Sequence, residues 1–170
     1  MPDTPLYDTD ILAWSGQQAG ALRQLAVRRD LPNELDLANV IEEIEDVGQS
    51  SLAAVEGFIR LILGHALKCV ADPDAPGLGH WQAEIGNWQA ELAGRFSPGM
   101  RRKLAVVPLW RRAIRQARLD LAAQGKDVSA LWAGLALAET DCPLTIDDLL
   151  SDPPDPAALV ARLCLALSPP

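Results

Sequence analysis

Apolar residues recur at intervals of three and four along one long stretch of the chain, residues 37–69. This spacing places them on one face of an α-helix, because the helix turns once every 3.6 residues. One longer interval surrounds Gly48, yet the phase of the pattern is the same on both sides of it. The pattern therefore predicts one long amphipathic helix over about residues 36–70. A break at Gly48 is the alternative, because glycine costs about 1 kcal/mol in a helix interior.

Abundant Ala and Leu, with few β-branched residues, favour helices over strands in the rest of the chain as well. We therefore predict an all-α fold, an irregular helical bundle of five to seven helices around the long amphipathic helix. Residues 1–153 are expected to form a single helical domain. Residues 154–170 are expected to form a C-terminal helix or tail that either packs on this domain or faces a partner.

The first helix is expected to begin with Asp8 as its N-cap, since a carboxylate at that position accepts hydrogen bonds from free backbone N–H groups. Tyr7 and Leu12 then stand at the two positions of a hydrophobic staple. The apolar pattern of this helix continues to about Arg29. A short segment of turn-forming residues separates it from the long helix.

Local signals mark further helix ends in the second half of the chain. Pro108 is expected to break or kink a helix, because it lacks a backbone N–H group. A further helix is predicted over residues 128–139. Thr145 and Asp148 have the spacing of a capping box, which predicts a short helix over residues 146–150.

Charge is unevenly distributed along a chain whose net charge is −8. Residues 1–94 carry five basic and fifteen acidic groups, whereas residues 95–126 carry nine basic groups and one acidic group. Residues 127–170 are acidic again, with one basic and seven acidic groups. The overall acidity argues against broad nucleic-acid binding, but the basic segment keeps a local contact possible.

Targeting and redox signals are weak. No apolar run approaches the roughly 20 residues that a membrane span requires, and the N-terminus has no positively charged segment followed by an apolar one. Cys69, Cys142 and Cys164 are far apart and lack metal-binding spacing. These features predict a cytoplasmic protein without a disulfide framework and without a membrane partner.

A series of motifs follows in a fixed order over residues 6–153. The series resembles Domain of Unknown Function family 29, a bacterial family. The resemblance implies an all-helical fold, and it implies no activity, since the family has none to carry over. Ser51 and residues 77–80 depart from the family pattern, so family features at those positions cannot be transferred. The matching motifs are Tyr7-Asp8-x-Asp10 with Trp14, Glu34-Leu35-Asp36-Leu37, Asn39-Val40-Ile41-Glu42-Glu43-Ile44-Glu45-Asp46-Val47-Gly48, His65-x-x-Lys68, Trp81, Trp110-Arg111, Cys142-Pro143 and Leu149-Leu150.

The acidic run of the long helix, Glu42, Glu43, Glu45 and Asp46, is the first candidate surface. Neighbouring carboxylates can bind a hard cation or serve acid–base chemistry. On a helical wheel, however, Glu42 and Asp46 point away from the apolar face, and Glu43 and Glu45 flank it on opposite sides. One cation therefore cannot easily contact all four. The simpler interpretation is a solvated face that pairs with the arginines of residues 101–118.

His65 and Lys68 form a second candidate pair, one helical turn apart at the edge of the apolar face. They can act as a general base and a phosphate contact, or as a structural pair. If the helix is continuous, His65 is roughly 30 Å from Glu45, too far for one active site within a monomer.

Arg111, Arg115 and Arg118 line one side of a predicted helix at positions i, i+4 and i+7. Such a stripe can contact phosphates. The aromatic residues that stack bases in single-strand binders do not accompany it. The alternative is pairing of these arginines with the acidic helix, within one chain or across a dimer.

These features leave the biochemical function unknown. The leading hypothesis is a non-enzymatic structural or interaction protein that self-associates as a homodimer, with another protein as the alternative partner. The alternative is a nucleic-acid-associated protein or a metal-dependent phosphodiester enzyme that uses the arginine stripe and the helix carboxylates. No catalytic residue is assigned, and no cofactor or metal is expected, because none of the common catalytic or zinc-binding motifs occurs in the sequence.

Overall fold

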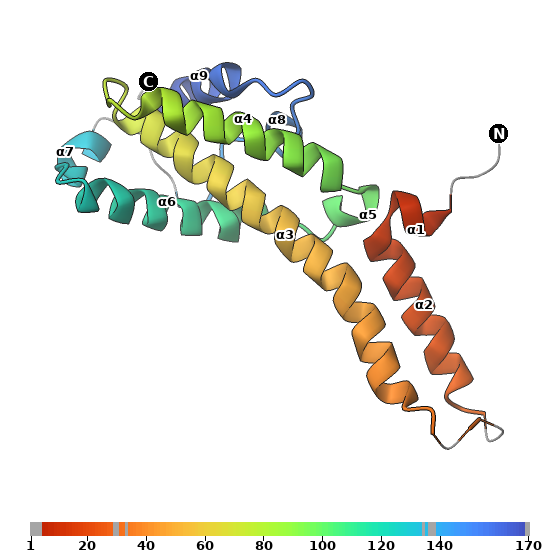
Figure 1. The fold of residues 1–170 in the computed structure, drawn as a ribbon. Coiled ribbons are helices and arrows are strands. Elements are labelled where there is room, and N and C mark those ends of the chain that lie inside the picture. Colours follow the sequence, from red (N-terminus) through yellow and green to blue (C-terminus); the bar gives the residue numbers. More distant parts are fainter. Residues whose placement is uncertain (1–4, 29–30, 33, 134, 136–138, 169–170) are drawn as a thin grey trace. The chain divides into compact units, whose positions relative to one another are not determined.

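A computed structural model describes residues 5–28, 31–32, 34–133, 135 and 139–168 (Figure 1). These residues form helices and no strand, which confirms the all-α prediction. Three of the helices have four residues each, so the described part holds more helical segments than the five to seven expected. Within it, no helix has the length and apolarity to cross a membrane. The helices are α1 (Leu6–Thr9), α2 (Ile11–Leu25), α3 (Leu37–Ala71), α4 (Leu78–Arg95), α5 (Pro98–Arg101), α6 (Val106–Ala123), α7 (Val128–Ala133), α8 (Ile146–Leu149) and α9 (Pro156–Leu167).

The helices belong to two compact units. The first unit comprises Met1–Val55 and Phe96–Leu104, and the second comprises Glu56–Arg95 and Ala105–Pro170. Helix α3 contributes its first half to the first unit and its second half to the second. It runs without interruption over 35 residues, so the long helix is confirmed and the break at Gly48 does not occur.

In the first unit, α2 packs closely on α3 at Gly48. A Cβ atom at that position would lie 2.1 Å from Ser15 Oγ and 3.2 Å from the Leu12 Cα atom. The absence of a side chain therefore allows the two helix backbones to approach each other. Helix α3 tolerates a glycine in its interior because close packing with α2 compensates for the lost helix propensity.

The N-terminal cap differs from the prediction. Asp10, not Asp8, caps α2, and its Oδ1 atom accepts a hydrogen bond from the Ala13 backbone N–H at 3.0 Å. Asp8 lies inside the four-residue helix α1, and Tyr7 makes an edge contact with the Trp14 ring at 4.9 Å rather than a staple with Leu12. The short helix places the cap two residues later in the chain.

Other local signals correspond to helix ends in the structure. Pro108 does not break a helix as predicted: α6 begins at Val106, so Pro108 lies in its first turn, where a missing N–H group breaks no hydrogen bond. Thr145 and Asp148 form the predicted capping box of α8. Helix α2 ends at Leu25, four residues before the predicted end at Arg29. Helix α7 covers the first part of the helix predicted over residues 128–139, and residues 134 and 136–138 of that range lie outside the described residues.

The core of the second unit is built on the buried side chains of the second half of α3. Trp110 of α6 and Ile85 of α4 are also fully buried in this unit. Helix α9 packs against α4 (Figure 1). Gly86 of α4 lies close to Pro156 of α9. The side chains that α9 buries recur every four residues, which is one face of a helix. They are Leu159, Leu163 and Leu167.

Candidate functional site

A cluster of charged side chains lies within the helices of the second unit. Lys68 of α3 is its centre, with a side chain only 6% exposed. The Lys68 ammonium lies 3.4 Å from Asp120 Oδ2 of α6 and 5.1 Å from the centre of the Trp81 ring of α4. A buried ammonium requires such partners, because burial without them is costly. Gln116 of α6 donates a hydrogen bond to the other oxygen of Asp120, at 2.8 Å.

His65 joins this cluster from one turn earlier on α3. Its Nε2 atom lies 2.8 Å from Glu84 Oε2 and 3.2 Å from Lys68 Nζ. A neutral imidazole either donates its proton to Glu84 or accepts one from Lys68, so the two contacts select different tautomers. Burial and the charge of Lys68 lower the pKa of His65, while Glu84 partly opposes them. The Trp88 ring packs against the imidazole edge at 4.7 Å.

The members of the cluster are paired with one another, because Lys68 faces Asp120 and His65 faces Glu84. We therefore interpret it as a polar connection between α3, α4 and α6. The sequence predicted that His65 and Lys68 lie together. It did not indicate Glu84 or Asp120, which lie on other helices. The need of a buried lysine for a carboxylate is the one signal that could have pointed to a partner such as Asp120.

The acidic run lies in the first unit, on the first half of α3. Glu45 pairs with Arg23 of α2 at 2.5 Å, and this contact lowers the pKa of Glu45. The predicted pairing with the arginines of residues 101–118 is thus wrong for Glu45, because α2 packs alongside this part of α3. Glu42, Glu43 and Asp46 are exposed, and none of them forms an ion pair within the described residues.

The arginine stripe lies on α6 in the second unit. Arg111 Nε donates a hydrogen bond to the Glu139 backbone carbonyl at 3.0 Å, and Arg118 lies 3.6 Å from the Glu139 carboxylate. The Arg118 guanidinium also lies over the Trp132 ring of α7, 5.7 Å from its centre. Two of the three arginines therefore hold the segment that follows α7.

Arg115 is exposed and lines a shallow groove of about 400 Å³ between α6 and the start of α7. The groove surface is almost entirely apolar apart from the two arginines at its edge. Leu119 stands in it with 65% of its surface exposed. We call this surface the α6 groove, and it is lined by Arg115, Arg118, Leu119, Ala122 and Val128.

Most of the helices just described lie in a part of the chain that matches a known protein family. Residues 6–153 match the model of DUF29, a domain of unknown function. The chain belongs to the DUF29 family. The match includes the acidic run, the charged cluster of the second unit and the α6 groove, and it ends before α9. The predicted family is thus confirmed, and the family description provides no activity.

A solved structure supports the all-α fold. The DUF29 chain is similar to an α-helical protein of unknown function from Rhodospirillum rubrum, with 34% sequence identity and a TM-score of 0.83. The similarity covers 95% of this chain and 99% of the other. No curated protein matched this chain.

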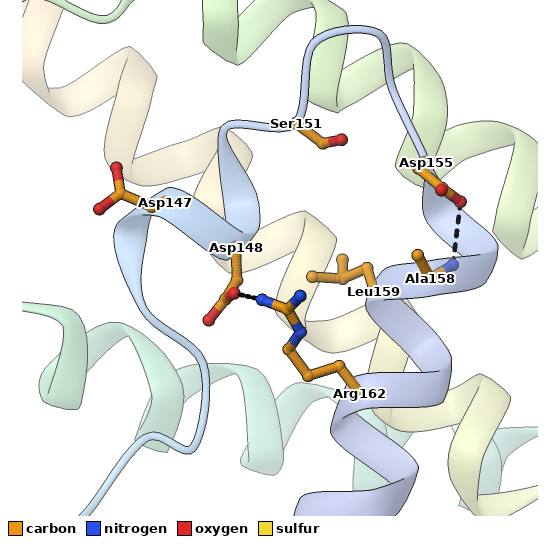
Figure 2. A pocket seen from close by; sticks show the side chains of 7 residues that line it. All are labelled: Asp147, Asp148, Ser151, Asp155, Ala158, Leu159 and Arg162. Carbon is orange, nitrogen blue, oxygen red and sulfur yellow. Dashed lines mark hydrogen bonds and ion pairs between the residues drawn. The ribbon is translucent and has the colours of Figure 1, made fainter.

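A second pocket in this DUF29 chain, of about 280 Å³, lies between α8 and α9 (Figure 2). Asp148 forms an ion pair with Arg162 there, and Asp155 caps α9 by accepting a hydrogen bond from the Ala158 N–H at 2.9 Å. Figure 2 shows the Asp147 side chain pointing away from Arg162. The carboxylates that face the pocket are thus already bound by groups of the chain itself.

The remaining reactive groups of the DUF29 chain have ordinary structural settings. Burial raises the pKa of the Cys142 thiol to about 11, and burial likewise raises the pKa of the Cys69 thiol to about 11. Both are therefore protonated thiols near neutral pH, which makes them weak nucleophiles. Over the described ranges, no group of three or more His, Cys, Asp or Glu side chains is placed to hold a metal ion.

Proposed function

We propose that this DUF29 chain is a non-enzymatic interaction protein that self-associates through an apolar stripe on α3. One observation carries the proposal: Val40 and Val47 are 39% and 43% exposed, although they lie in the first third of a long amphipathic helix. They are seven residues apart and therefore lie on the same side of the helix. Half-buried Ile44 lies between them. We call these three residues the α3 stripe.

The helical spacing distinguishes this stripe from other exposed apolar residues. Val27 and Leu165 are even more exposed, at 82% and 78%, but single apolar residues are common on protein surfaces. Apolar residues that recur at intervals of three and four form the contact line of paired helices. The proposal accordingly assigns the α3 stripe, rather than these single residues, to the association surface.

Sedimentation velocity over roughly 1–100 μM, a range that brackets micromolar dissociation constants, tests the proposal. We expect the wild-type chain to form dimers or larger assemblies, and the Val40→Gln/Val47→Gln variant to be monomeric. Each valine buries enough apolar surface to contribute about 1 kcal/mol, so the double variant should raise the dissociation constant at least roughly tenfold. Val27→Gln is the control, since it removes a more exposed valine outside the stripe. A wild-type chain that stays monomeric throughout contradicts the proposal.

The contacts of the arginine stripe support nucleic-acid association less well than the exposed α3 stripe supports self-association, because most of these arginines already have partners in the chain. Arg111 and Arg118 already contact Glu139, which leaves Arg115 as the most accessible member. Phosphate binding by a single arginine is weak, because affinity for nucleic acid depends on the number of phosphates contacted. The expected cytoplasmic location likewise stays a prediction.

A further inference from the structure

We infer that the α3 stripe of one copy docks in the α6 groove of a second copy. This inference rests on the proposed self-association and names the surface that receives the stripe. Two features of the stripe restrict its partner: it is apolar, and it is surrounded by negative charge. The receiving surface must therefore offer exposed apolar side chains together with basic ones.

A second copy of the stripe does not meet this requirement. Residues 34–55 contain six acidic groups and no basic group. Glu43 lies three residues after Val40 and four before Val47, so it stands on the same side of α3 as the stripe. Two stripes packed on each other would bring such carboxylates together, and juxtaposed like charges disfavour an interface.

The α6 groove has the complementary character. Helix α6, which forms most of it, contains four basic groups and one acidic group, Asp120, which pairs with Lys68. Leu119 is 65% exposed in the groove, and Ala122 is exposed beside it. This patch is therefore apolar and positively charged, whereas the stripe is apolar and negatively charged.

The spacing of the side chains supports the pairing. Arg115 and Leu119 are four residues apart, so both lie on the same side of α6. Glu43 has the same relation to Val47 on α3. With α3 and α6 running in the same direction across the contact, docking Val47 against Leu119 places the Glu43 carboxylate within reach of the Arg115 guanidinium, since each lies one turn before the docked residue. Arg118 stays on Glu139 and Trp132 and forms the wall of the groove.

The contact joins two different patches, so each copy offers one stripe and one groove. Two copies that each use both patches form a closed dimer, and copies that use them in sequence form an open chain. Both arrangements allow complementation. A chain without a working stripe still has its groove, and a chain without a working groove still has its stripe.

The decisive experiment mixes two association-defective chains at equal concentration in sedimentation velocity. One carries Val40→Gln/Val47→Gln, and the other carries Leu119→Gln in the groove. We expect each chain alone to be monomeric and the mixture to form a one-to-one complex. If the wild type assembles and Leu119→Gln assembles equally well, the stripe has another partner and the inference is wrong, while the proposed function stands. If the wild type is monomeric, the proposed function itself fails.

Charge reversal tests the contact between Glu43 and Arg115 in the same assay. Glu43→Arg and Arg115→Glu should each raise the dissociation constant roughly tenfold, because each brings like charges together. The chain that carries both changes should return to within about threefold of the wild type, since an opposite-charge pair is restored. Glu42→Arg, on another side of α3, and Lys103→Glu, an exposed residue outside the groove, are the matched controls. The pairing is wrong if each single reversal changes the dissociation constant no more than its control does. It is also wrong if the double variant has a dissociation constant as high as those of the single variants.

Discussion

Gly48 allows α2 and α3 to approach closely. In Gly48→Ala, the new Cβ atom would overlap Ser15 Oγ and press on the Leu12 backbone. We expect the overlap to destabilise the fold by about 1–3 kcal/mol, the usual result of overpacking. The loss outweighs the gain of up to about 1 kcal/mol in helix propensity. Chemical denaturation followed by circular dichroism measures the difference.

Gly57, nine residues later on the same helix, provides the control. A Cβ atom at Gly57 would meet no other atom within 4 Å. Gly57→Ala should therefore stabilise the chain by as much as about 1 kcal/mol, through helix propensity alone. If Gly48→Ala and Gly57→Ala change the free energy of unfolding equally, the close approach at Gly48 is not formed in solution.

Asp10 joins the start of α2 to the segment around α5. Its carboxylate accepts hydrogen bonds from the Ala13 N–H at 3.0 Å, from Ser97 Oγ at 2.8 Å and from the Gly99 N–H at 2.6 Å. Burial by itself raises the pKa of Asp10, but these hydrogen bonds together lower it below the ordinary value of 3.8. All three partners are donors, so the site requires a group that only accepts.

Asp10→Asn should therefore destabilise the chain by about 2 kcal/mol at neutral pH, because an amide nitrogen cannot accept a hydrogen bond. The folded-state pKa of Asp10 lies below its unfolded value, so its contribution is present above about pH 4 and is lost as the pH falls further. The difference between wild type and variant should thus shrink on acidification from pH 5 to pH 3 in denaturation experiments. Asp8→Asn, at an exposed position, should have little effect. A constant difference over this range would contradict the role of the Asp10 charge.

At the scale of elements, α3, α4 and α6 are joined by the cluster around Lys68. The cluster should make the second unit sensitive to mild acid, because burial and Lys68 lower the pKa of His65 below its ordinary value of 6.5. The unfolded chain then binds a proton on His65 that the folded chain does not. The free energy of unfolding therefore decreases as the pH falls below about 6.5, and the decrease ends at the lower folded-state pKa.

We expect His65→Gln to reduce this pH dependence between about pH 7 and pH 5, the range in which an ordinary histidine titrates. The measurement is the free energy of unfolding from urea titrations at several pH values. His80→Gln serves as the control, because His80 also lies near Glu84, at 3.4 Å, but is 71% exposed. If the free energy of unfolding of His65→Gln changes with pH as steeply as that of the wild type, another group causes the acid sensitivity.

The elements also show which contacts a sequence can reveal. The continuity of α3 and the capping box of α8 were predictable, because they depend on residues three or four positions apart. The pair of Arg23 with Glu45 and the bonds of Asp10 to Ser97 join residues 22 and 87 positions apart. No local pattern specifies which arginine meets which carboxylate across helices. The Asp8 cap was wrong because Asp8 and Asp10 are equally good caps, and only the short helix α1 decides between them.

At the scale of the whole molecule, a net charge of −8 acts against any self-association, although acidic and basic segments of the chain attract each other locally. Added salt weakens both effects. It screens the repulsion between two acidic chains, which favours assembly, and it screens exposed pairs such as Glu43 with Arg115, which disfavours it. The net response of the wild type alone therefore does not separate the two contributions.

A variant with the same net charge as the wild type separates the repulsion between whole chains from the attraction between Glu43 and Arg115. Glu43→Gln/Arg115→Gln removes one negative and one positive charge, so the repulsion between whole chains is unchanged. Between about 0.1 M and 1 M salt the screening length falls from about 10 Å to about 3 Å. We expect the dissociation constant of the wild type to rise by roughly threefold to tenfold more than that of the variant over this range, because only the wild type loses an attractive pair. Parallel salt curves for the two chains would show that the assembly does not depend on opposite charges across the interface, and a steeper curve for the variant would exclude the pairing of Glu43 with Arg115.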